Sequence, residues 1–466
     1  MIKKNDEFIV DIIDYGADGE GIAKIDGYTI FIMDALKGEK CEIHITKVLK
    51  SYAYAKVVKV ISNSIYRKEP DCSTYKRCGG CNLRHISYEE TLKIKKEKIQ
   101  NLADKTFGKE KIKIGETIGM ENPFHYRNKA IYPVNQKKEV GIYANRSHEI
   151  IPINKCFIQT ELSQKIAKYI IDNWNESIYN EETQKGLLRN IMVREGFGTH
   201  EVMVVLVQTK EKNVFEKENS NLSIEKLINE FPMIKTIIIN VNKENTNVVL
   251  SRDNIIVYGK GYIKDKLGGY TFKISANSFY QINPVQTEKI YNLAIKKAEL
   301  KNEDIVCDLY CGIGTIGIFA AKYVSKVYGI EIVEEAIKDA KENAKINGIS
   351  NADFLVGDVE NVFDELLKKG TKPNTVFVDP PRKGLDKNTI ENLKKLKLEK
   401  IVYVSCNPAT LVRDLKELNS VYDINSVTPI DNFCFTSHVE VVTLLELKEE
   451  LKNTIVWIQG ENRLWK

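Results

Sequence analysis

The sequence contains no long apolar run, and no stretch approaches the roughly 20 residues that a helix needs to cross a bilayer. Residues 1–8 (MIKKNDEF) include no apolar segment of the kind that a secretory signal carries. An excess of one charge is also missing, because 69 Lys and Arg face 64 Asp and Glu, a net charge of +5. We therefore expect a cytoplasmic protein without a membrane span, and the overall charge by itself favours no partner.

Composition and length exclude a disordered chain and a single compact core. Hydrophobic residues make up 43% of the sequence and charged residues 29%, as in ordinary folded proteins. At 466 residues the chain is too long for one core, so we expect two or three domains.

Disulfide bonds are not expected, because the chain has an odd number of cysteines, nine, and is predicted to be cytoplasmic. Cys72, Cys78 and Cys81 follow the pattern C-x5-C-x2-C, and Cys156 offers a fourth thiol. Four cysteine ligands fit either zinc or a [4Fe–4S] cluster. A closed set of four ligands indicates a role in folding and in positioning a partner rather than in catalysis.

The first two regions differ in their patterns. Residues 1–60 show short alternating strands with turn signals, which predicts a small β-barrel. Residues 65–265 mix strands with helical segments at 89–103 and 161–174, which predicts a central α+β domain. Within it, residues 91–113 hold eight Lys against three acids, an excess that would attract phosphates, although a solvated helix face is the commoner explanation.

The last region, residues 270–448, has a different pattern from about residue 285. Apolar strands alternate with helical segments, which predicts a Rossmann-like, doubly wound parallel sheet and makes the whole chain a multi-domain α/β protein. Ligands of such sheets bind outside the carboxyl ends of the strands. Residues 449–466 form a tail to which we assign no role.

A glycine-rich turn in this region predicts a nucleotide-like cofactor. Residues 312–317 match G-x-G-x-x-G, a pattern that alone is ambiguous. Asp308, just before the turn, would repel a pyrophosphate but suits the cationic sulfonium and amino group of S-adenosylmethionine. Glu331 and Asp358 follow at the next two strand ends, where they would receive the ribose hydroxyls and the adenine amino group. Each acid alone is more often a solvated residue or a helix cap, but the three together indicate S-adenosylmethionine.

Cys406 ends a later strand and is predicted to be a nucleophile rather than a core residue. Asp379-Pro380-Pro381-Arg382 replaces the Asn-Pro-Pro-aromatic sequence of amine methyltransferases, which suits a target carbon without a lone pair. A thiolate that adds to C6 of uracil makes C5 nucleophilic, and the helix beginning near Pro408 would favour that thiolate. Glu440, in an apolar strand, is the candidate base that removes the C5 proton, and Asp379 would accept a hydrogen bond from N3–H.

These motifs, in this order, resemble those of the RNA uracil-5-methyltransferases, and most closely the iron–sulfur members that act on 23S ribosomal RNA. The resemblance spans residues 8 to 447 and implies an N-terminal RNA-binding TRAM domain, a methyltransferase core and a [4Fe–4S] cluster on Cys72, Cys78, Cys81 and Cys156. It also implies Cys406 as nucleophile, Glu440 as base and a pocket shaped by Phe279. The implied contacts to S-adenosylmethionine are Gln281, Tyr310, Thr315, Glu331, Asp358 and Asp379.

From this resemblance we expect a monomeric enzyme whose partner is 23S ribosomal RNA. Two alternatives stay open. A transfer-RNA uracil-5-methyltransferase is the first, although such relatives typically lack the four cysteines and the N-terminal barrel. A non-catalytic iron–sulfur RNA-binding protein is the second, and the presence of Cys406, Asp379 and Glu440 counts against it.

Overall fold

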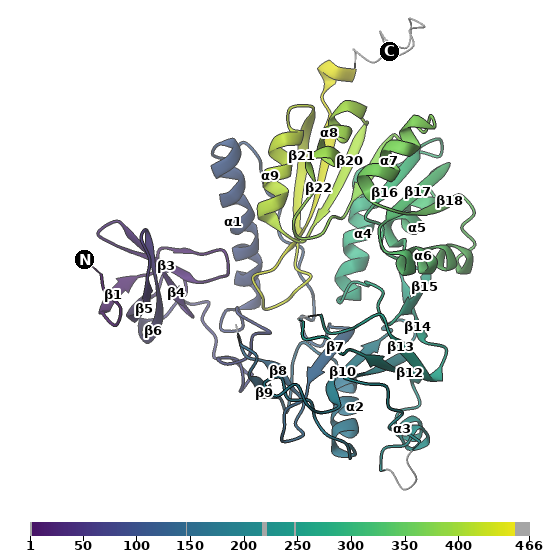
Figure 1. Cartoon of the computed structure of the whole chain (residues 1–466). Helices are drawn as coiled ribbons and strands as arrows, with labels where there is room; N and C mark the ends of the chain where they lie inside the picture. The colour runs from purple at the N-terminus through teal and green to yellow at the C-terminus, as the bar shows by residue number, and fades with distance from the viewer. Residues whose placement is uncertain (1, 146, 217–220, 247, 453–466) are drawn as a thin grey trace, which may run out of the picture.

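The computed structural model describes residues 2–145, 147–216, 221–246 and 248–452. Figure 1 shows a small β unit at the N-terminus, a mixed domain below and a larger α/β domain above. None of the helices in these ranges is long and apolar enough to cross a membrane. Most of the predicted tail, residues 453–466, lies outside the described residues.

The N-terminal unit is one six-stranded sheet in the order β1-β5-β6-β4-β3-β2. Alternating residues such as Ile30, Ile32, Ile43 and Ile45 point into a common core that the structure buries completely. The strand-rich prediction for residues 1–60 is therefore confirmed. Its strands are β1 (Glu7–Asp11), β2 (Asp14–Tyr15), β3 (Gly21–Ile25), β4 (Tyr28–Met33), β5 (Lys40–Val48) and β6 (Tyr52–Ser62).

The central domain is built on a five-stranded sheet in the order β13-β12-β11-β10-β7. Helix α2 (Glu161–Asp172) packs its apolar side on β10, as its predicted periodicity requires. The strands and the remaining helix are β7 (Lys129–Pro133), β10 (Leu188–Glu195), β11 (Val202–Gln208), β12 (Ile234–Val241), β13 (Asn254–Gly259) and α3 (Ile224–Glu230). Two hairpins flank the sheet, β8 (Gly141–Tyr143) with β9 (Ile150–Pro152) and β14 (Tyr262–Leu267) with β15 (Tyr270–Ser275).

Helix α1 (Tyr88–Phe107) connects the domains. The predicted helix at 89–103 is confirmed, but its apolar side packs against helix α9 (Pro408–Leu418) of the C-terminal domain. The chain after it continues along the same domain, where Ile114 and Ile118 form bridges with Val427 and Ile430. The segment from 88 to 118 thus belongs, by its contacts, with the C-terminal sheet.

The C-terminal domain is a seven-stranded sheet in the order β18-β17-β16-β19-β20-β22-β21, covered by helices on both faces (Figure 1). The first five strands are parallel, and β22 is inserted antiparallel between β20 and β21. The strands are β16 (Ile305–Leu309), β17 (Lys326–Glu331), β18 (Ala352–Val356), β19 (Thr375–Val378), β20 (Lys400–Ser405), β21 (Tyr422–Ile430) and β22 (Glu440–Leu447). The other helices are α4 (Pro284–Ala298), α5 (Thr315–Ala321), α6 (Glu334–Ile346), α7 (Val359–Lys368) and α8 (Lys387–Leu396).

Candidate active site and cysteine cavity

The strand order of the C-terminal sheet reverses at β16, with β17 on one side and β19 on the other. Asp379 directly follows β19, and Cys406 directly follows β20. Because β22 runs antiparallel beside β20 and Ser405 pairs with Val441, Cys406 and Glu440 lie across the end of the ladder from each other. The topology thus brings all three predicted catalytic side chains to one edge of the sheet.

The two carboxyl groups of this edge share an apolar environment. Burial raises the pKa of Asp379 to about 7. Burial, and then the charge of Asp379, raises the pKa of Glu440 to about 8, while the side chain of Asn432 and the guanidinium of Arg382 act in the opposite direction. Glu440 is only 3% exposed. A carboxyl group tuned to this range can gain and lose a proton near neutral pH, as a general base must.

The Cys406 thiol does not show the acidic shift that its helix predicted. Asn407 caps α9 directly after it, so the predicted helix start is confirmed. Burial, and then the charges of Glu440 and Asp379, nevertheless raise the pKa of Cys406 to about 11, and only Arg382 lowers it among nearby side chains. In the protein alone, burial and then the two carboxyl groups thus oppose the stabilisation of the thiolate that is expected from the helix terminus. A cation bound at this edge would lower that pKa.

Next to the glycine-rich turn lies a third buried acid, Asp308, on which the charge of Asp379 acts. The Asp308 carboxylate accepts a hydrogen bond from the Gly317 amide at 2.8 Å, and its other oxygen has no partner among the described residues. Burial raises the pKa of Asp308 to about 8. Tyr310 has a left-handed backbone (φ 65°), a conformation that non-glycine residues adopt rarely and that concentrates at functional sites. A cationic ligand at this turn would compensate the charge of Asp308.

Of the other predicted cofactor residues, Glu331 and Thr315 lie at this turn. Glu331 accepts from the Gly312 amide at 3.2 Å and from Val333, Thr315 opens α5, and the Gln281 side chain is buried. Asp358 is exposed and caps α7 by accepting a hydrogen bond from the Glu360 amide. A helix cap was the alternative to a role in cofactor binding.

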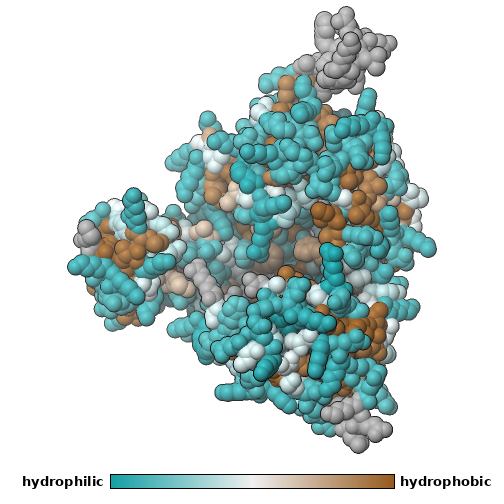
Figure 2. Space-filling model, in the orientation of Figure 1, coloured by the Kyte–Doolittle hydropathy of each residue, from teal (hydrophilic) through white to brown (hydrophobic). Residues whose placement is uncertain are grey.

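A cleft of about 910 Å³ reaches the turn from the side of the central domain. Gly312, Glu331 and the exposed Phe279 line it on one side, and Arg252 and Asn254 line it on the other. The two domains face each other across a hollow in Figure 2. A ligand at the turn can therefore be reached from solvent.

Tyr291 is a member of this site that the sequence did not reveal. Its hydroxyl oxygen accepts a hydrogen bond from the Thr315 hydroxyl at 3.2 Å, and the charges of Asp379, Asp308 and Glu440 all act on it. The residue lies on α4, whose apolar periodicity marks Tyr291 only as a core position. No local signal could have identified it.

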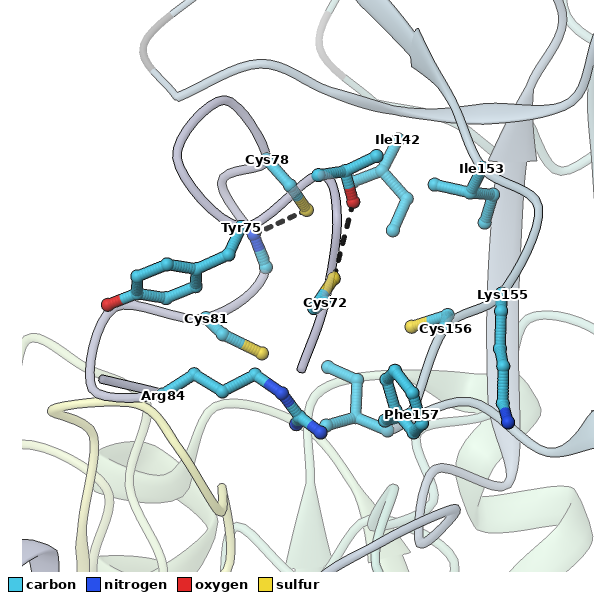
Figure 3. A pocket seen from close by; sticks show the side chains of 13 residues that line it. Cys72, Tyr75, Cys78, Cys81, Arg84, Ile142, Ile153, Lys155, Cys156 and Phe157 are labelled. Atoms are coloured by element: carbon cyan, nitrogen blue, oxygen red, sulfur yellow. Dashed lines mark hydrogen bonds between the residues drawn. The ribbon is translucent and has the colours of Figure 1, made fainter. Parts of the chain in front are cut away.

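The four predicted cysteine ligands line one cavity (Figure 3). Cys72, Cys78 and Cys81 come from a loop without regular structure, and Cys156 enters from the chain after β9. The sulfur atoms of Cys81 and Cys156 point toward each other in Figure 3. Burial, and then Cys156, raises the pKa of Cys81 to about 12. The thiols therefore need a bound cation before they can be thiolates together.

These cysteines are free, and in the described ranges no three His, Cys, Asp or Glu side chains stand where they could hold a metal ion. Arg84 lies against the cavity, stacked over the rings of Phe157 and Phe435 at 4.7 and 4.6 Å. The four thiols therefore line one cavity, but among the described residues they are not arranged as a ligand set for one metal ion.

The lysine-rich segment is partly structural. Lys95 is buried in an ion pair with Asp431, and Lys98 donates to the Ser437 carbonyl at 3.1 Å. Lys96 and Lys93 are bound to Glu116 and Glu90 at the surface. The simple solvated-face explanation is therefore wrong for Lys95, because this lysine faces the C-terminal domain.

Known proteins similar to this chain agree with the fold and the site described above. The family model described as tRNA (Uracil-5-)-methyltransferase matches residues 87–448, and the TRAM domain model matches residues 3–58. An uncharacterized RNA methyltransferase of Clostridium tetani is 45% identical over 451 residues, 95% of this chain and 97% of that protein. An uncharacterized RNA methyltransferase of Staphylococcus aureus (strain MRSA252) is 44% identical over 454 residues, 96% of this chain and 99% of that protein.

A solved structure is similar over nearly the whole length. The tRNA (uracil-54, C5)-methyltransferase of Pyrococcus abyssi, determined with S-adenosyl-L-homocysteine, aligns with a TM-score of 0.73 at 29% identity. The alignment covers 94% of this chain and 99% of that one. Such coverage includes the N-terminal unit, so the expectation that transfer-RNA enzymes lack it was wrong for this enzyme.

Proposed function

Because the chain belongs to the S-adenosylmethionine-dependent RNA uracil-5-methyltransferases, we propose that it methylates C5 of a uridine in 23S ribosomal RNA through Cys406. The observation that carries the proposal is the placement of Cys406 opposite Glu440, with Asp379 at the neighbouring strand end. A nucleophile and a base on one ladder end can act on adjacent atoms of one pyrimidine ring.

In this reaction the Cys406 sulfur adds to C6, and the C5=C6 electron pair moves onto C5 and O4. Asp308 and Asp379 would hold the cationic methyl donor at this edge, and its positive charge would lower the pKa of the Cys406 thiol and favour its thiolate. C5 then takes the methyl group, and S-adenosylhomocysteine leaves.

Glu440 completes the cycle. Its carboxylate removes the C5 proton, the C5=C6 double bond forms again, and the bond between C6 and the Cys406 sulfur breaks. The released proton passes from Glu440 to solvent. Asp379 accepts N3–H and holds the ring in place, and Gln281, Tyr310, Thr315, Glu331 and Asp358 bind the methyl donor.

The cavity of Cys72, Cys78, Cys81 and Cys156 is proposed to hold a [4Fe–4S] cluster. Zinc with Zn–S bonds of about 2.3 Å would hold four sulfur atoms within about 3.8 Å of one another. A four-iron cluster separates them further, and the proposal of a cluster rests on the resemblance and on the four thiols that line one cavity. The anaerobically purified protein is expected to be brown and to contain about four iron atoms per chain, and Cys81→Ser is expected to be colourless. Stoichiometric zinc in a colourless protein would contradict the cluster.

The RNA target is tested with two substrates. The loop that carries Cys72, Cys78 and Cys81, here called the cysteine loop, resembles the corresponding loop of ribosomal-RNA enzymes, which supports 23S ribosomal RNA as the target. The Pyrococcus abyssi structure supports a transfer RNA as the second candidate. Unmodified 23S RNA and unmodified tRNA transcripts, incubated with methyl-labelled S-adenosylmethionine, are expected to show label in 23S RNA. Label in tRNA alone would identify the second candidate instead.

Covalent catalysis has its own test. RNA containing 5-fluorouridine carries a fluorine that the base cannot abstract, so the wild-type protein should be trapped as a denaturation-resistant adduct. Cys406→Ala should form none. An adduct with Cys406→Ala would overturn the assignment of the nucleophile, and the absence of one with the wild type would overturn the mechanism.

A further inference from the structure

The segment that leads into Glu440, residues 431–439, is here called the pre-base loop. It has no regular structure, and Phe435 within it has a left-handed backbone (φ 62°). A phenylalanine in this conformation is strained, so the surroundings must hold it there. Two amides do so, because Asn82 and Leu83 both donate to the Phe435 carbonyl, at 3.1 and 3.0 Å.

Asn82 contacts this loop with its side chain as well. Its amide oxygen accepts from the Ser437 amide at 2.9 Å, and its amide nitrogen donates to the Ser437 hydroxyl at 3.1 Å. The same nitrogen donates to the Asp18 carbonyl of the N-terminal unit at 2.6 Å. One amide group therefore joins three regions of the molecule.

Asn82 directly follows Cys81 in the chain, and Ser437 precedes Glu440 by three residues. Arg84, against the cysteine cavity, stacks on Phe435 of the same loop. The pre-base loop is thus bonded to the cysteine loop at Phe435 and at Ser437, next to the point where β22 begins. A shift in the cysteine loop would move the start of that strand.

We propose that Asn82 is a positioning residue for Glu440. Through Asn82, the cysteine loop fixes the position of the carboxyl group that removes the C5 proton. The inference rests on the proposed function of Glu440. It assigns to the cysteine loop a task in the reaction, namely holding the pre-base loop. Because proton removal is the last step, a displaced Glu440 leaves the earlier addition of sulfur and the methyl transfer intact.

The test is Asn82→Ala with ordinary uridine RNA. Turnover is expected to fall about tenfold, as when a base loses its alignment, whereas kcat/KM for RNA should change by less than about twofold, because the steps up to methyl transfer are unaffected. A covalent RNA–protein adduct should accumulate on a denaturing gel. The visible absorbance and the melting temperature should match those of the wild type.

Two further variants separate the contacts of Asn82. Asn82→Asp keeps an acceptor for the Ser437 amide and hydroxyl but cannot donate to Asp18, and it should restore most of the turnover. Asn101→Ala, the same change as Asn82→Ala at an exposed position of α1, should behave as the wild type.

Three outcomes contradict the proposal: unchanged turnover in Asn82→Ala, slow turnover without adduct, and equal loss in Asn82→Asp. A wild-type protein that 5-fluorouridine RNA does not trap would contradict the proposed function instead. Trapping of the wild type together with normal turnover of Asn82→Ala would leave the proposed function intact and refute the role of Asn82 alone.

Discussion

At the scale of single residues, Glu440 combines a nearly complete burial with a pKa that this burial raises to about 8. Glu440→Gln keeps the shape of the side chain but cannot accept the proton. We expect methyl transfer to proceed while elimination slows roughly 100-fold or more. The measurement is the decay of the methylated RNA–protein adduct after a chase with unlabelled RNA. Loss of activity without any adduct would show that Glu440 serves an earlier step.

Asp308 makes a prediction about pH. Its pKa, about 8 in the folded protein, lies far above that of an unfolded Asp, so the folded state holds the extra proton between about pH 4 and 8. The stability that this proton provides is fully present below about pH 4 and is lost as the pH rises from there through 8. Asp308→Asn resembles the protonated acid and does not titrate, so its free energy of unfolding should gain on that of the wild type by about 1.4 kcal/mol per pH unit in this window. Its advantage should therefore be several kcal/mol larger at pH 9 than at pH 5.

Urea unfolding of both proteins without methyl donor checks this difference. Addition of S-adenosylmethionine should reverse the order at pH 9, because its positive charge compensates Asp308 only in the wild type. Parallel pH profiles of the two proteins would mean that the folded state does not raise the pKa of Asp308.

At the scale of elements, the sequence predicted which strand ends carry catalytic or cofactor-binding residues, but not how β22 brings Glu440 to the same edge of the sheet. Asp308 and Glu331 lie at the ends of β16 and β17, Asp379 and Cys406 directly follow β19 and β20, and parallel strands end at one edge. The position of Glu440 depended on β22 entering antiparallel beside β20, a choice that strand patterns do not encode. Contacts between distant segments set this arrangement.

The docking of α1 was unpredictable for the same reason. Its periodicity gave the helix, but not the domain that covers its apolar side. The burial of Lys95 follows only from the position of Asp431, more than 300 residues later in the chain. Tyr291 and Asn82 likewise acquire their contacts from tertiary packing, so local sequence signals could not single them out.

The pair of α1 and the pre-base loop gives a prediction at this scale. Lys95 is 1% exposed, and it also donates to the Phe433 carbonyl at 3.1 Å. Lys95→Ala leaves the Asp431 charge buried without its partner and should lower the free energy of unfolding by roughly 3–5 kcal/mol. Lys96→Ala, on the same helix, removes a surface pair and should change it by less than about 1 kcal/mol. Equal effects in urea unfolding would contradict the anchoring role of Lys95.

At the scale of the whole molecule, the N-terminal unit is held by two ion pairs of different kinds. Arg67, in the chain between this unit and the cysteine loop, binds the fully buried Glu39 carboxylate with two nitrogens, at 2.5 and 2.7 Å. Lys37 reaches Glu97 of α1 at 3.5 Å, with both side chains nearly half exposed. Burial makes the first pair expensive to break, whereas solvent screens the second.

Arg67→Ala should therefore destabilise the N-terminal unit by roughly 2–3 kcal/mol, since Glu39 would keep a buried charge without its partner. Because the unit matches the TRAM domain and is expected to bind RNA, loosening it should lower the affinity for RNA while the affinity for S-adenosylmethionine stays constant. Lys37→Ala should leave both affinities within twofold of the wild type, since surface pairs contribute about 0–1 kcal/mol. Filter binding of RNA and calorimetry of the methyl donor measure the two affinities. If Arg67→Ala lowered the affinities for RNA and for S-adenosylmethionine equally, the N-terminal unit would support the fold of the methyltransferase domain and not RNA binding.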